Sequence, residues 1–74
     1  MAYPISSTAK TALARERLRR HWSQMYVATQ IGVKSNTYAT WELGVRRPPL
    51  RMAMALATLY ETPVEDLFPL EEAN

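Results

Sequence analysis

Near the middle of this chain lies a group of short polar side chains, Ser35, Asn36, Thr37 and Thr40. If this segment is a helix that buries Tyr38 and Trp41, the four polar side chains face outward, where they can reach base edges or phosphates. An ordinary solvent-exposed helix could carry the same residues. Such a face would normally mix both signs of charge, however, and this one has no acid. The segment therefore favours contact with nucleic acid.

Catalytic chemistry has little support in this sequence, which contains one histidine and no cysteine. An enzyme needs a nucleophile with a base, paired carboxylates in a pocket, or a metal cluster. We therefore expect no enzyme, no catalytic residue, no metal ion and no cofactor.

Charge is strongly segregated along the chain. All nine Lys and Arg occur at or before Arg51, with only Glu16 and Glu42 among them, so this stretch has a net charge of +7. The remaining acids follow without any base and reduce the total to +2. A basic stretch can be merely a solvated face, but this asymmetry favours a polyanionic partner for the first part of the chain.

The chain length of 74 residues is enough for one small domain, which buries only about 60% of the surface of its unfolded chain. Without cysteine, helix packing or a partner subunit must supply stability. The most apolar run, residues 52–57, is far shorter than the roughly 18 residues of a membrane span. We expect a soluble, cytoplasmic domain over residues 9–69, a flexible arm at 1–8 and an acidic tail at 70–74.

Apolar periodicity predicts an all-α fold with five helices. The first four are expected at about residues 9–20, 24–30, 35–43 and 49–60, and a short fifth helix should end by Pro69. The second helix should end at Gly32, and the third at Gly44 in the left-handed conformation.

Helix starts are indicated by capping residues. Ser23 should cap the second helix, and one residue of 6–8 the first. Pro49 fits the first position of the fourth helix, and residues 62–65 have the pattern of a capping box for the fifth. The buried face is expected to comprise Leu13, Ala14, Leu18, Trp22, Val27, Ala28, Ile31, Val33, Tyr38, Trp41, Leu50, Ala53, Leu56, Ala57, Tyr60, Leu67 and Phe68.

Many of these residues occur in an order and spacing that match a known pattern. The positions are Arg17, Trp22-Ser23-Gln24, Val27-Ala28, Ile31-Gly32-Val33, Tyr38, Trp41-Glu42, Gly44, Arg47-Pro48 and Leu67-Phe68. Over about residues 13–68 the chain resembles helix-turn-helix proteins of the phage-repressor and Cro type, the XRE family. The resemblance implies a five-helix lambda-repressor-like domain whose second and third helices form the motif. It also implies a transcriptional regulator, a repressor, that binds a palindromic operator in double-stranded DNA as a homodimer.

The resemblance further implies roles in reading DNA bases. Gln24 matches a glutamine that in relatives bonds a phosphate and sometimes a neighbouring base. Asn36 is the strongest candidate, because its amide can form two hydrogen bonds with adenine. The full set of base-reading candidates is Gln24, Ser35, Asn36, Thr37 and Thr40.

Other residues carry expected roles in phosphate binding and in stability. Lys34, Arg46 and Arg47 are expected to contact phosphates, although each could be a plain solvated cation. Arg17 and Glu42 match a partly buried ion pair that joins the first and third helices in relatives. We expect this pair to be structural and to affect binding only through folding.

Three positions depart from the family pattern. Leu43 stands where many relatives have an asparagine that holds a phosphate. His21 stands where glycine commonly ends the first helix, and histidine tolerates the left-handed region. Lys34 replaces the usual capping serine or threonine, so Ser35 could cap the third helix instead and be unavailable to a base.

A second functional class remains open from the sequence. This fold also serves in antitoxins and adaptors that act mainly through a protein partner such as a toxin. The acidic end and the methionines Met52 or Met54 would suit such a surface, although these residues also fit an ordinary core stripe or a homodimer contact.

Overall fold

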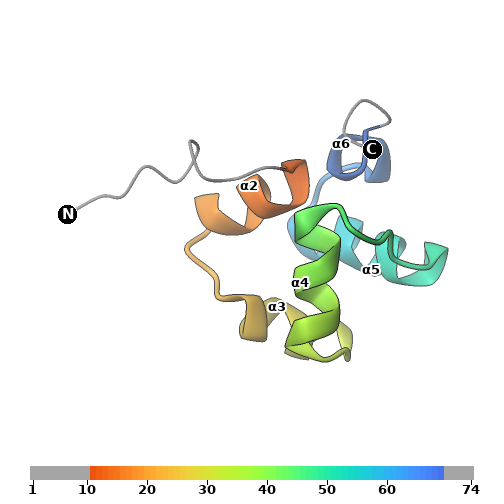
Figure 1. The fold of residues 1–74 in the computed structure, drawn as a ribbon. Helices are drawn as coiled ribbons and strands as arrows, with labels where there is room; N and C mark the ends of the chain where they lie inside the picture. The colour runs from red at the N-terminus through yellow and green to blue at the C-terminus, as the bar shows by residue number, and fades with distance from the viewer. Residues whose placement is uncertain (1–10, 70–74) are drawn as a thin grey trace.

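The computed structural model describes residues 11–69, and within them the chain forms α-helices and no strands. The helices are α2 (Ala12–Arg19), α3 (Gln24–Ile31), α4 (Ser35–Leu43), α5 (Leu50–Tyr60) and α6 (Val64–Leu67). Figure 1 shows α3 and α4 next to each other in the lower part of the view, with α2 above them, α5 to the right of α4 and α6 at the upper right. The all-α fold predicted from the sequence is therefore confirmed. The predicted arm at 1–8 and tail at 70–74 lie outside the described residues.

The helix starts match the predictions only in part. Ser23 caps α3 as expected, because its Oγ accepts a hydrogen bond from the Tyr26 backbone N–H at 2.9 Å. Helix α2 begins later than predicted, at Ala12, and its cap is Thr11, while the candidate caps at 6–8 lie outside the described residues. The capping box predicted at residues 62–65 is wrong. Pro63 occupies the cap position without a side-chain bond, and the Thr62 hydroxyl donates instead to the Tyr60 carbonyl at 2.9 Å.

The helix ends use the left-handed conformation at four positions. Gly44 has a φ value of +78°, as predicted, and Gly32, which was expected only to end its helix, has +80°. His21, with φ of +60°, follows Arg20, the right-handed cap residue of α2, and its N–H donates to the Leu18 carbonyl at 3.0 Å, in line with the role at the helix end expected for it. Glu61 was not foreseen in such a conformation. It has φ of +52° and ends α5, at a conformational cost that glycine would not incur.

The core forms where α2, α3, α4, α5 and α6 meet. Most of its predicted residues are buried, but Leu50 is 72% exposed, so its assignment to the core is wrong. Leu50 has the correct helical spacing to the buried Ala53, but it lies in the first turn of α5, which extends beyond the edge of the core. The buried cluster consists of Leu13, Val27, Ala28, Tyr38, Trp41, Leu56, Tyr60 and Leu67.

Two buried tyrosines add a polar contact to this core. The hydroxyl oxygens of Tyr38 and Tyr60 lie 2.6 Å apart, so one hydroxyl donates to the other. Burial raises the pKa of Tyr60 to about 12, and burial likewise raises the pKa of Tyr38. Both groups therefore stay protonated and hydrogen-bonded at neutral pH. Among the described helices, none is long and apolar enough to cross a membrane.

Candidate nucleic-acid interface

Helices α3 and α4 pack against each other and are joined by a short turn that begins at Gly32. The left-handed φ of Gly32 reverses the chain, and Val33 then packs against the core. The two helices form a corner in which α4 lies at the surface of the fold (Figure 1). This is the arrangement of a helix-turn-helix, in which the second helix is free to enter a groove.

The inner side of α4 is fixed by its two aromatic residues. Tyr38 is fully buried and Trp41 is 6% exposed, and their rings meet edge to face with centroids 6.3 Å apart. Because these side chains anchor one face of the helix, the opposite face is turned toward solvent. Asn36 and Thr37 are exposed there, and Thr40 is half-buried. The Thr40 hydroxyl donates to the Thr37 carbonyl at 2.7 Å, so toward a ligand it offers only its acceptor lone pairs and its methyl group.

The start of α4 differs from one expectation. Ser35 is the first residue of the helix and not its cap, so the expected cap at this residue is wrong. The cap position belongs to Lys34, which is exposed and makes no side-chain bond to the helix. Ser35 is half-buried, and its hydroxyl is not consumed in capping. Ser35 therefore stays a candidate for base contact.

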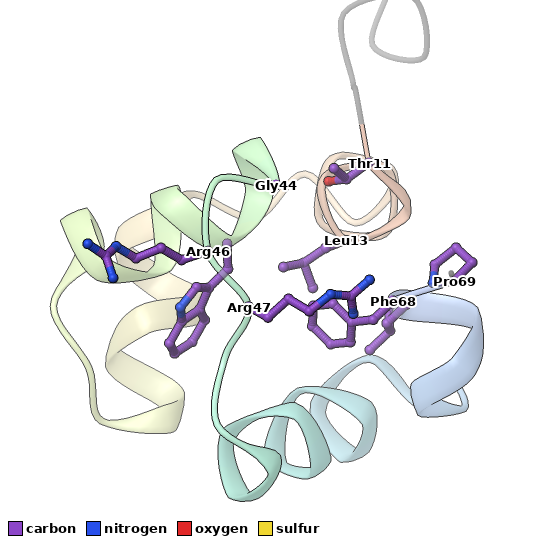
Figure 2. A pocket seen from close by; sticks show the side chains of 9 residues that line it. Thr11, Leu13, Gly44, Arg46, Arg47, Phe68 and Pro69 are labelled. Carbon is purple, nitrogen blue, oxygen red and sulfur yellow. The ribbon is translucent and has the colours of Figure 1, made fainter. Parts of the chain in front are cut away.

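The loop after α4 carries the two predicted phosphate-binding arginines. Arg46 and Arg47 are both exposed, and neither forms an ion pair with another residue of the described region. Figure 2 shows their side chains leaving the loop in opposite directions, with Arg47 directed toward Phe68. The two cations therefore lie on different sides of the loop. The cavity between them measures about 30 Å³, room for about one water molecule and not for a ligand.

Acidic side chains are kept away from this surface. Glu16 on α2 is paired with Arg19 and Arg20 at 2.6 and 2.9 Å. Those bonds, chiefly the one from Arg20, lower the pKa of Glu16. Glu42 is the sole acid on α4, and only 5% of it is exposed. The outer face of α4 and the loop after it consequently present no exposed carboxylate, and their exposed side chains are polar, basic and, at Leu43 and Val45, apolar.

The structure brings together Arg17, Glu42 and Gln24. Arg17 donates from Nε and Nη2 to the two carboxylate oxygens of Glu42, at 2.5 and 3.1 Å, and from Nη1 to the Trp22 carbonyl at 2.7 Å. Burial lowers the pKa of Arg17, but the hydrogen bond and charge of Glu42 more than offset this, and the pKa is raised. The ion pair thus ties α2 to α4 in its charged form.

Gln24 is the candidate whose placement adds most to the sequence analysis. Its Nε2 donates to Glu42 Oε1 at 3.0 Å, so the amide is held from within the protein. Sequence reasoning assigned Gln24 to DNA and Glu42 to structure separately, and no signal in the sequence joined them.

Two exposed apolar residues also lie at the last position of α4 and in the loop just after it. Leu43 is 62% exposed and Val45 is 70% exposed. Leu43 follows Asn36 by seven residues, so it continues the outward face of the helix. That spacing could have marked Leu43 as a surface residue from the sequence alone.

Known proteins resemble the chain over most of its length. A family model described as helix-turn-helix matches residues 13–67. The HTH-type transcriptional regulator AnsR of Bacillus subtilis is 37% identical over 60 residues, which is 81% of this chain and 52% of that protein. The cryptic phage CTXphi transcriptional repressor RstR of Vibrio cholerae is 38% identical over 58 residues, 78% of this chain and 52% of that protein. The chain thus spans about half the length of these relatives. No solved structure is significantly similar to it.

Proposed function

This chain belongs to the helix-turn-helix family of the phage-repressor and Cro type, the XRE family, and on that premise we propose that it binds double-stranded DNA sequence-specifically and represses transcription. Both relatives are named as transcriptional regulators, one of them a repressor, which supports this role. A role on DNA also implies a location in the cytoplasm.

The observation that carries the proposal is the acid-free outer face of α4. Its polar side chains have a size and chemistry suited to a major groove about 12 Å wide. Asn36, exposed in the first turn of α4, is the strongest candidate for reading a base, because an amide can bond adenine through both of its polar atoms. The other candidates for base contact are Gln24, Ser35, Thr37 and Thr40.

Cations precede and follow α4 in the chain and would bind the phosphates. Lys34 precedes α4, and Arg46 and Arg47 follow it, all three exposed. Such contacts release counterions from DNA, so the affinity should fall steeply with salt concentration. They fix the position of the protein on the duplex without specifying sequence.

We further propose that two copies bind together on a palindromic site. The domain measures 36 × 28 × 22 Å along its principal axes, dimensions that allow two adjacent copies to place their α4 helices about 34 Å apart, one turn of DNA. A groove of about 290 Å³ between the loop after α4 and helices α5 and α6 suits this contact. Its wall includes the exposed Leu50 and the half-buried Val64 and Phe68, apolar side chains that a second copy would remove from water.

Selection of bound duplexes from random DNA tests the whole proposal. The expected result is a two-fold symmetric sequence whose half-sites are centred about 10 base pairs apart. Sedimentation of the protein alone and with the selected duplex then gives the number of copies bound. Failure to enrich any sequence would refute sequence-specific binding, and a single copy on an asymmetric site would refute the dimer alone.

A further inference from the structure

The carboxylate of Glu42 is a meeting point of three helices. Its Oε2 accepts from Arg17 on α2, and its Oε1 accepts from both Arg17 and Gln24, the latter being the first residue of α3. Only 5% of Glu42 is exposed, so these bonds are largely shielded from water. Both carboxylate oxygens are therefore occupied by donors from within the protein.

This arrangement determines the orientation of the Gln24 amide. An ionised carboxylate can only accept hydrogen bonds, so the amide must turn its NH₂ group toward Glu42 and its carbonyl oxygen away. One N–H and the carbonyl oxygen of Gln24 are then left over, and neither meets a partner among the residues that the structure describes. The side chain is half-buried, so these two groups remain accessible.

We infer that Glu42 is a positioning residue for DNA recognition, which holds the Gln24 amide so that its carbonyl oxygen and its remaining N–H meet the edge of a base. The inference rests on the proposed DNA-binding function. An adjacent donor and acceptor match the N7 acceptor and N6 donor of adenine. A phosphate, in contrast, offers acceptors alone, so it could pair with the remaining N–H but would leave the carbonyl oxygen without a donor. Glu42 thus favours a base, and adenine in particular, as the partner of Gln24.

The size of the effect follows from the freedom that a glutamine loses on binding. Ordering a long side chain at an interface weakens association by about two- to tenfold, and Glu42 has already ordered this one before DNA arrives. Removing the hydrogen bond between Gln24 and Glu42 should therefore reduce the affinity for DNA by about two- to tenfold, and only when Gln24 is present.

A double-mutant cycle on the selected duplex separates this role from folding. Affinity is compared for the unchanged chain, Glu42→Gln, Gln24→Ala and the double variant, at a temperature where circular dichroism finds all four folded. In the unchanged background, Glu42→Gln should reduce the affinity for the duplex two- to tenfold. In the background of Gln24→Ala, adding Glu42→Gln should reduce the affinity little further. An equal loss in both backgrounds would mean that Glu42 acts only through stability, and would overturn the inference.

Two further measurements test the same inference if the Glu42→Gln variant fails to fold. Glu42→Asp keeps the charge that faces Arg17 but shortens the side chain and withdraws its oxygen from Gln24, so the same cycle can be run with it. Nitrogen-15 relaxation of the side-chain amides needs no variant. Gln24 should be more ordered than Gln30, a matched glutamine that is exposed at the other end of α3. Equal disorder of the two amides would also overturn the inference.

If the unchanged chain binds no selected duplex, the DNA-binding proposal fails and the inference fails with it, even where the Gln24 amide is ordered.

Discussion

Replacing Arg17 by methionine should strongly destabilise the fold. Methionine keeps much of the side-chain length but loses the two bonds to Glu42 and the bond to the Trp22 carbonyl. The ion pair is well shielded, with side-chain exposures of 13% for Arg17 and 5% for Glu42. Removing one member leaves the other as a buried charge without its counter-charge, which costs about 3–5 kcal/mol.

This loss is large relative to the total free energy of unfolding of the domain. A chain of this size is expected to have a free energy of unfolding on the order of 4–11 kcal/mol. For a domain of this size, each kcal/mol lost lowers Tm by about 4–8 °C. The variant should therefore melt at least about 10 °C below the unchanged protein, as measured by circular dichroism together with urea unfolding.

Arg19→Met provides the matched control on the same helix. The side chain of Arg19 is 67% exposed and pairs with Glu16, which retains Arg20 as a second partner. Exposed pairs contribute about 0–1 kcal/mol, so this variant should unfold close to the unchanged protein. A loss below about 1 kcal/mol for Arg17→Met, or equal losses at the two positions, would refute the claim that burial makes the Arg17 pair essential.

Three other predictions concern a helix end, DNA choice and alkaline stability. Glu61→Gly should raise the free energy of unfolding by about 0.5–1 kcal/mol, because glycine adopts the left-handed conformation of this position without strain. Glu65→Gly, inside α6, should lower the free energy of unfolding. Thermal melting shifts of the same sign for both variants would contradict this. Asn36→Ala should relax the choice of base at one position of the selected site, whereas Arg47→Ala should weaken all sequences alike and reduce the salt slope by about 1; binding titrations over a set of single-base variants distinguish the two patterns. Burial raises the pKa of Tyr60 to about 12, so the contribution of this side chain to stability should be complete below pH 10 and decline as the pH rises from about 10 through 12. Urea unfolding at a series of pH values checks this decline. The Tyr60→Phe variant should lose part of the decline.

The sequence alone was enough to predict the helices and most of their ends. The positions of α3 and α4 follow from apolar spacing and from Ser23, Gly32 and Gly44, whose effects act within a single helical turn. Burial of Tyr38 and Trp41 follows from the same periodicity. The outward face of α4 was predictable for that reason, while contact of its residues with DNA stays a prediction.

Tertiary structure decided the features that join residues distant in the chain. The bond from Gln24 to Glu42 spans 18 positions, and the Thr11 hydroxyl that caps α2 donates to the Glu42 carbonyl 31 positions away at 2.8 Å. Leu50 has the spacing of a core residue and is nevertheless exposed. Helical periodicity fixes which side of a helix is apolar, but it does not fix where the neighbouring helices end. The angle and depth at which helices dock therefore determined which side chains were buried and which polar groups met.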